Sequence, residues 1–282
     1  MAYLTVLREC ARRLADRGRP GRLAAIPAGR DASPALPADT YLYRAWRRVV
    51  QNIPGQCSLC QCPAPGGRLC PQCETELVYS LRHTTTPRCA VCALALNPDG
   101  SCPDCQARRP AFDRVIAAFD YDNPGDLLIH RFKHGCFVDA PMLAGLLADA
   151  VRQAALPLPP ATILVPVPSS RAAILRRGFN PAAEVARYLA RDLGLACKPW
   201  LLRRSREGVR QAYLSKPERM RGAEHLYCCP VSVPQAAIAV VDDVITTGST
   251  LHAIAGLFKR AGAASVYGLV LARTPRPPAR TE

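Results

Sequence analysis

Four Cys-x-x-Cys pairs between residues 57 and 105 constrain the fold of this chain more than any other feature. They are Cys57/Cys60, Cys70/Cys73, Cys89/Cys92 and Cys102/Cys105. A Cys-x-x-Cys turn places two thiolates on one side of a tight loop, and two such turns complete the tetrahedron that zinc prefers. The last two pairs repeat the spacing of the first two after 32 residues. The segment is therefore predicted to form two small zinc ribbons in tandem.

Two pairings of these cysteines are open. A sequential arrangement joins the first pair with the second, whereas a cross-braced arrangement joins the first with the third. The two equal gaps, residues 61–69 and 93–101, favour the sequential arrangement. Cys62 is a competing ligand by position, and we interpret it as a spare thiol. Closed four-thiolate sites have no open coordination position, so we expect structural zinc and no metal catalysis from them.

The composition sets wider bounds. Of the 282 residues 49% are hydrophobic and 21% charged, which excludes global disorder and allows one large domain or two modest ones. We find no run of 18 apolar residues that would span a membrane, and arginines interrupt the apolar residues of the N-terminus, so no secretory signal is predicted. We therefore expect a cytoplasmic chain whose 14 cysteines are not in disulfides.

The formal net charge of +15 favours anionic partners such as nucleotides, phosphorylated sugars, nucleic acid or anionic lipid. The competing interpretation is a solvated, arginine-rich surface. Charge alone does not decide between them.

After residue 110 the pattern changes to apolar strands that alternate with helices. Strands are predicted at residues 115–121, 162–167, 237–241 and 265–272, and helices at 127–133, 140–155, 181–193 and 249–261. This alternation is typical of an α/β domain with a parallel sheet flanked by helices. We predict a basic N-terminal extension (1–42), a double zinc ribbon (43–110) and the α/β domain (111–282).

Residues 239–250 are the most informative segment of the α/β domain. A buried strand leads into Asp242 and Asp243, and the loop that follows it contains Thr246, Thr247, Gly248, Ser249 and Thr250. Open α/β sheets bind ligands at the carboxyl ends of their strands, and a loop that opens a helix suits a phosphate monoester. The carboxylates would accept hydrogen bonds from ribose hydroxyls or hold Mg²⁺. A capped turn without a ligand is the competing interpretation, and the absence of a Walker lysine argues against an ATPase.

This string resembles the phosphoribosyl pyrophosphate (PRPP) motif of type I phosphoribosyltransferases. The order of further motifs resembles the ComF family, phosphoribosyltransferase-like proteins associated with competence for DNA uptake. These motifs are the cysteine pairs, RFKHG at 131–135, VPVP at 165–168, RRGFN at 176–180, RQ at 210–211, LS at 214–215 and ER at 218–219. The resemblance runs from about residue 43 to 275. Pro181 and Gly222 depart from it, where the family commonly has Gln and Asn.

The resemblance implies roles for particular residues. Asp242 and Asp243 would bind the ribose 2′ and 3′ hydroxyls, and residues 246–250 the 5′-phosphate of PRPP, with Mg²⁺ as a cofactor. The loop containing Ser169, Ser170 and Arg171 would face the pyrophosphate. Further candidate contacts to the anion are Lys133, Arg177, Arg210 and Gln211. For Lys133 the alternative is the solvated edge of a helix.

Residues 198–221 hold eight basic residues and two acidic ones. In the similar transferases a mobile hood closes over the pyrophosphate and excludes water, and a basic segment equally suits single-stranded DNA. Two functions therefore stay open. One is phosphoribosyl transfer from PRPP to an unidentified acceptor. The other is a non-catalytic protein of DNA uptake that senses PRPP or binds single-stranded DNA, with uptake proteins as further partners.

Overall fold

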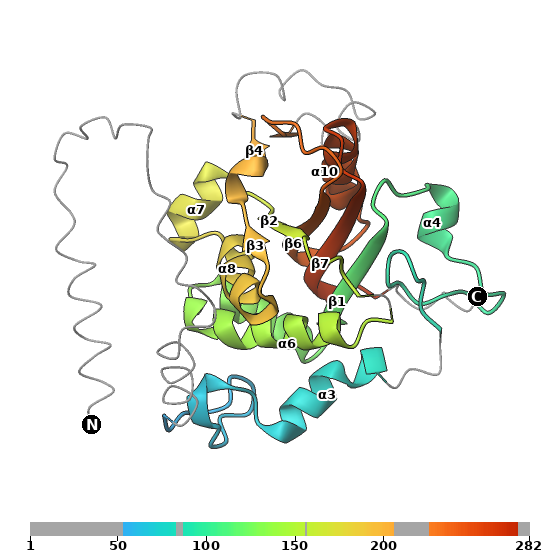
Figure 1. The fold of residues 1–282 in the computed structure, drawn as a ribbon. Coiled ribbons are helices and arrows are strands. Elements are labelled where there is room, and N and C mark those ends of the chain that lie inside the picture. Colours follow the sequence, from blue (N-terminus) through green and yellow to red (C-terminus); the bar gives the residue numbers. More distant parts are fainter. Residues whose placement is uncertain (1–52, 83–86, 156, 206–225, 276–282) are drawn as a thin grey trace, which may run out of the picture. The chain divides into compact units, whose positions relative to one another are not determined.

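A five-stranded parallel sheet forms the centre of the α/β region, in the order β1-β7-β6-β2-β3 (Figure 1). Every neighbouring pair runs parallel. The strands are β1 (Arg114–Asp120), β2 (Ile163–Pro166), β3 (Ala196–Cys197), β6 (Ala237–Ile245) and β7 (Ser265–Arg273). The four strands expected from the sequence are all present, and the predicted fold class is confirmed.

The computed structural model describes residues 53–82, 87–155, 157–205 and 226–275. All of them belong to one unit, Ala38–Glu282. The predicted extension, residues 1–42, lies outside the described residues, as do Arg210 and Gln211 of the predicted hood. The division into three domains stays a prediction.

Helices cover both faces of the sheet. They are α5 (Gly125–Lys133), α6 (Ala140–Arg152), α8 (Pro181–Leu193) and α10 (Ser249–Arg260), whereas the short α7 (Arg171–Arg177) has no buried residue. Successive strand residues point to opposite faces, so the side chains of β6 pack into two separate cores, one on each face of the sheet. Ala239 and Val241 pack with α5, α6 and α8, whereas Ile238 and Val240 pack with α10. We call these the α6 core and the α10 core.

The cysteine repeats have the same backbone in both copies. In each, the first cysteine donates its N–H across a tight loop, from Cys57 to the Cys62 carbonyl and from Cys89 to the Leu94 carbonyl, both at 2.8 Å. A residue with positive φ closes each loop, Gln61 at 63° and Ala93 at 60°. The second half of each repeat starts a helix at a proline, α3 (Pro71–Arg82) and α4 (Pro103–Ala107). The 32-residue repeat of the sequence is therefore a structural repeat.

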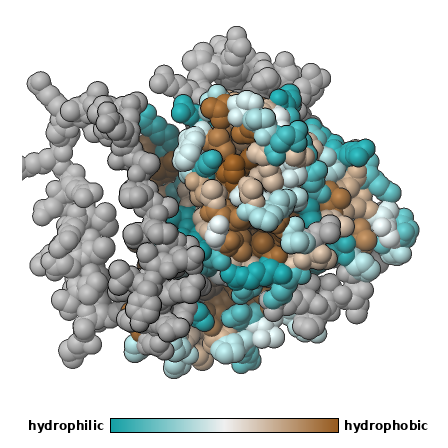
Figure 2. Space-filling view, viewed as in Figure 1, coloured by the Kyte–Doolittle hydropathy of each residue, from teal (hydrophilic) through white to brown (hydrophobic). Residues whose placement is uncertain are grey.

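Short elements complete the described chain. They are the 3₁₀ turns η1 (Pro65–Gly67), η2 (Phe137–Asp139) and η3 (Pro199–Leu201), and an antiparallel pair of β4 (Arg203–Arg204) and β5 (Tyr227–Cys228). Figure 2 shows hydrophobic and hydrophilic residues interspersed on one face. Within the described ranges, no helix has the length and apolar character to cross a membrane.

Candidate phosphate site and cysteine clusters

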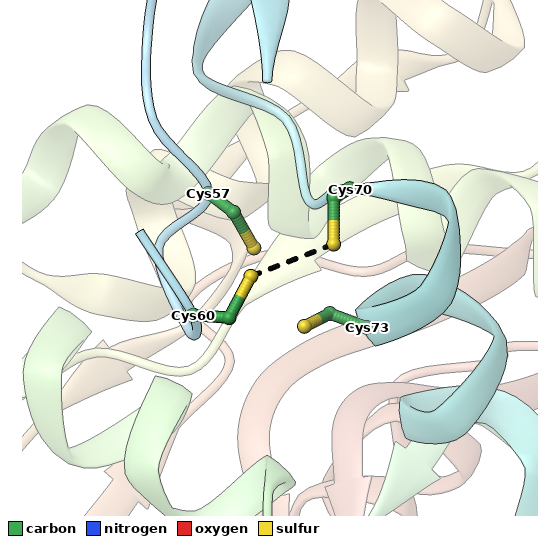
Figure 3. A group of neighbouring side chains, drawn as sticks. All are labelled: Cys57, Cys60, Cys70 and Cys73. Carbon is green, nitrogen blue, oxygen red and sulfur yellow. Dashed lines mark hydrogen bonds between the residues drawn. The ribbon is translucent and has the colours of Figure 1, made fainter. Parts of the chain in front are cut away.

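The eight cysteines of the pairs form two clusters, and the pairing is sequential. The first cysteine cluster is Cys57, Cys60, Cys70 and Cys73, and the second is Cys89, Cys92, Cys102 and Cys105. Figure 3 shows the sulfurs of the first cluster turned toward one another. Within each cluster all Sγ atoms lie within 4.8 Å of one another. The cross-braced alternative is wrong, and Cys62 is exposed and outside both clusters.

The spacing of the sulfurs fits a tetrahedral metal ion. A zinc–thiolate bond of about 2.3 Å places neighbouring sulfurs of a tetrahedron about 3.8 Å apart. The Sγ–Sγ distances are 3.6 Å for Cys60–Cys70, 3.8 Å for Cys89–Cys105 and 3.4 Å for Cys92–Cys102. Both clusters are therefore shaped for a metal ion bound by four thiolates.

Thiol ionisation within the clusters also points to a cation. Burial raises the pKa of Cys57, but hydrogen bonds from the backbone of Cys60 and Cys70 outweigh it and bring the pKa to about 6. For Cys92, burial and the neighbouring Cys102 and Cys89 raise the pKa to about 11. One thiolate thus opposes the ionisation of its neighbours, and a bound divalent cation removes that opposition.

The acidic pair lies on β6, which continues to Ile245 beyond the expected end of the strand at residue 241. Lys133 from α5 forms an ion pair with Asp243, with Nζ 2.9 Å from Oδ2. Burial and the nearby charge of Asp243 raise the pKa of Asp242 to about 7. Lys133 therefore belongs to this site, and Asp242 is a carboxylate whose charged form would gain from hydroxyl donors or a cation.

The phosphate loop, which we define as residues 246–250, leads from β6 into α10. Gly248 adopts a left-handed conformation, φ 71°, at the N-cap of the helix. A side chain there would be strained, and its Cβ would contact the Phe112 ring at 3.7 Å. Thr246, Thr247 and Ser249 are exposed, and Gly248 and Thr250 half-buried. Asp242 and the loop residues 246 and 248–250 line one small cavity of about 40 Å³.

The segment expected to face a pyrophosphate is partly helical, because α7 begins at Arg171. The Ser170 hydroxyl caps this helix and accepts a hydrogen bond from the Ala173 N–H at 3.2 Å. Ser169 donates to Asn180, 3.0 Å away, so both hydroxyls serve the local fold. Arg171 is exposed. Arg177, in the last turn of α7, is half-buried.

One residue of this region escaped the sequence analysis. Arg273, the last residue of β7, is 2% exposed and reaches the phosphate loop and the second cysteine cluster at once. The only signal in the sequence is a charged residue that directly follows a largely apolar strand without any acidic or basic residue. The strand was expected to end at residue 272, which placed Arg273 in the following loop.

Comparison with known proteins places the chain in a family. It is 34% identical over 230 residues to the DNA utilization protein YhgH of Salmonella typhi. The alignment covers 79% of this chain and 99% of the relative. This chain is 30% identical over 227 residues to competence protein F of Haemophilus influenzae, spanning 78% and 90%. The chain belongs to the ComF family. A further ComF relative, competence protein ComFC of Bacillus subtilis, is 27% identical over 218 residues, spanning 74% and 86%.

The scan against protein-family models finds no match. Among solved structures, an allosteric regulatory enzyme of purine biosynthesis is similar with a TM-score of 0.32 and 20% identity, over 47% of this chain and 25% of the other. An alanine mutant from a study of an invariant aspartic acid in HPRTs is similar with a TM-score of 0.29 and 17% identity, over 50% of this chain and 71% of the other. The ComF assignment rests on the sequence relatives, and the fold class on the parallel sheet.

Proposed function

We propose that this ComF-family protein binds PRPP with Mg²⁺ at the carboxyl edge of its sheet and transfers the phosphoribosyl group. The shared cavity of Asp242 and the phosphate loop carries the proposal. It puts a carboxylate suited to ribose hydroxyls beside backbone amides suited to a phosphate. Lys133, paired with Asp243, adds a positive charge at the same edge.

The proposed residue roles are those that the resemblance to type I phosphoribosyltransferases implies. Asp242 and Asp243 would accept hydrogen bonds from the two ribose hydroxyls, and the phosphate loop would bind the 5′-phosphate. The pyrophosphate would lie toward Arg171 at the start of α7. Mg²⁺ would be held through the carboxylates and PRPP itself, and it would neutralise charge on the leaving pyrophosphate.

The proposed reaction is a displacement at C1 of the ribose. The bond from C1 to the pyrophosphate oxygen breaks, a bond to the acceptor forms with inversion, and the acceptor's proton leaves to solvent or to the released pyrophosphate. The protein's contribution is chiefly to position the two reactants and to stabilise the charge of the leaving group.

We further propose that the two cysteine clusters hold structural zinc. Four thiolates at tetrahedral spacing are a closed site, and the segment that contains them buries few large apolar side chains of its own. Zinc binding would therefore contribute directly to its folding.

A role in DNA uptake is the wider part of the proposal. It is supported by the names of the relatives, a DNA utilization protein and a competence protein, and by the net charge of +15. The second candidate is a non-catalytic uptake protein that binds PRPP or single-stranded DNA.

Titration calorimetry of the purified protein with PRPP tests the site, with and without Mg²⁺. We expect Mg²⁺-dependent binding that falls at least tenfold when Asp242 and Asp243 are both changed to Asn. Asp149→Asn, an exposed acid on α6, is the matched control and should bind as the parent does. Equal binding by the double variant would refute the site. Binding of a single-stranded oligonucleotide without any PRPP binding would favour the second candidate.

A further inference from the structure

The second cysteine cluster and the phosphate loop share one buried cation. The Arg273 guanidinium donates from Nε to the Cys92 carbonyl at 3.1 Å, and its Nη2 lies 3.1 Å from the Asp104 carboxylate. On its other side, Nη1 donates to the carbonyls of Ile245, at 3.3 Å, and Thr246. One side chain thus binds the metal-binding module and the first residue of the phosphate loop.

Two further contacts join the same parts of the chain. The Phe112 ring lies against Gly248 of the phosphate loop. The Ala111 N–H donates to Nδ1 of His252 on α10, 3.1 Å away. Between the second cluster and the loop lies a cavity of about 440 Å³, lined by residues of both. The segment from Cys105 to Phe112 therefore forms part of the wall beside the phosphate loop.

A buried guanidinium makes this connection energetically significant. Its donors are planar and fixed in direction, so it satisfies these acceptors only while both parts of the chain keep their positions. If residues 89–105 lose their fold, Cys92 and Asp104 move away and leave a buried charge partly unpaired. The loop carbonyls that Arg273 holds then lose a fixed donor.

The first cysteine cluster is connected differently. It packs into the α6 core through Leu69, Leu77 and Val78. Its polar link is the Ser58 hydroxyl, which donates to Asp139 at 2.9 Å. Within the described ranges, no hydrogen bond or ion pair joins this cluster to the phosphate loop.

We propose that Arg273 is a positioning residue through which the second cysteine cluster holds the phosphate loop in its anion-binding conformation. Zinc in that cluster and a phosphate ligand in the loop then raise each other's affinity, because such coupling is reciprocal. Zinc in the first cluster is not coupled to the loop. The inference rests on the proposed PRPP site for its ligand, but not for the ordering of the loop.

A matched pair of cysteine variants tests the coupling. Cys105→Ser removes a ligand from the second cluster and Cys73→Ser one from the first, and elemental analysis should show the loss of one zinc in each. Hydrogen exchange of the amides in residues 246–250, without ligand, should be at least tenfold faster in Cys105→Ser and within twofold of the parent in Cys73→Ser. Equal exchange in the two variants would overturn the proposal.

Arginine variants test the path. Arg273→Lys keeps the charge but not the planar set of donors, so it should also speed exchange of the loop amides while retaining both zinc ions. The control is Arg88→Gln, which removes a half-buried arginine next to the second cluster that donates to Asp120 and to the Ala93 carbonyl. A loop unaffected by Arg273→Lys, or equally affected by Arg88→Gln, would contradict the assigned path.

The reciprocal effect is measured on the parent protein. Zinc release to a chromogenic chelator should have two phases, and saturating PRPP with Mg²⁺ should slow one of them at least fivefold. That phase should be absent from Cys105→Ser and present in Cys73→Ser. Slowing of both phases, or of the first-cluster phase alone, would overturn the coupling. If the parent does not bind PRPP, the proposed function fails, and loop exchange in the variants still decides the inference.

Discussion

The two cysteine repeats share one sequence frame and one backbone, yet they are built into different parts of the molecule. The first packs into the α6 core and contributes Ser58 to buried Asp139. The second packs into the α10 core and is bound by the half-buried Arg88 and the buried Arg273. The arrangement of the four cysteines is thus a local property of the repeat, whereas the contacts of each repeat with the rest of the chain depend on the surface it covers.

The largest expected effect comes from loss of the metal. We expect two zinc ions per chain, one for each cluster. Cys60→Ser, at an exposed ligand of the first cluster, should lose one ion with changes confined to residues 53–82. Cys102→Ser, at a buried ligand in the α10 core, should also loosen residues 245–275. Elemental analysis and hydrogen exchange check both, and less than one zinc in the parent would contradict the assignment.

The next largest effect is expected on the free energy of unfolding, when the ion pairs beside the two repeats are broken. Arg88 contacts Asp120 through two bonds, with only 18% and 3% of these side chains exposed. Arg88→Gln leaves that carboxylate uncompensated and should cost about 3–5 kcal/mol of unfolding free energy. Near the first repeat, Arg131 pairs with Asp139 but is 48% exposed. Arg131→Gln should cost about 1 kcal/mol or less.

Denaturant unfolding of the two arginine variants measures the difference. A double variant in which both Arg88 and Asp120 are replaced by Leu should recover part of the loss, since it removes the unpaired charge. Equal costs for Arg88→Gln and Arg131→Gln would contradict the distinction drawn between the more buried and the more exposed ion pair.

The smallest expected effect is the pH dependence of stability that Asp242 causes. It arises at the carboxyl edge of the sheet, where Lys133 of α5 pairs with Asp243. Burial and the charge of Asp243 raise the pKa of Asp242 from 3.8 to about 7 in the folded protein. The folded state therefore binds more protons than the unfolded state between about pH 4 and 7, and stability falls as pH rises through that window. Asp242→Asn removes this loss and should be more stable than the parent by about 1–4 kcal/mol above pH 7.

Denaturant unfolding from pH 4 to 8 checks the sign of this difference, which should shrink toward pH 4. Asp243→Asn is the comparison variant: it breaks the ion pair with Lys133 but also removes the charge that raises the pKa of Asp242, so it should narrow the pH-dependent loss without abolishing it. Lys133→Met should move the window to higher pH, since the lysine lowers the pKa of Asp242. A pH-independent difference for Asp242→Asn would contradict the assignment.

Local rules predicted much of the fold. The helix predicted at residues 181–193 has the bounds of α8. Pro181 starts it, as proline does at a first helical position, and the structure shows that Gly194 ends it in a left-handed conformation. The helix α7 was missed, since a seven-residue amphipathic segment after Ser170 has little periodicity to recognise. The end of β6 was placed four residues early, because acidic residues weaken the strand pattern although they pair in register with β7.

The candidate site was predicted in part for a similar reason. The acidic pair and the phosphate loop are contiguous in the chain, so one segment displays them together. The ion pair of Lys133 with Asp243 joins residues more than a hundred positions apart. The sequence therefore left two interpretations of Lys133 open, a site residue or the solvated edge of a helix. Contacts of this kind arise from the order of strands in the sheet, which places α5 next to the end of β6.

The sequence by itself determined the cysteine repeat, the parallel α/β pattern and the resemblance to ComF proteins, because each is written in short-range spacing. Only the tertiary structure decided that the pairing is sequential, that the two repeats enter different cores, and that Arg273 joins the second repeat to the phosphate loop. Spacing specifies which groups can meet within a turn or an element. Which distant groups actually meet depends on how strands are ordered and how buried charges find their partners.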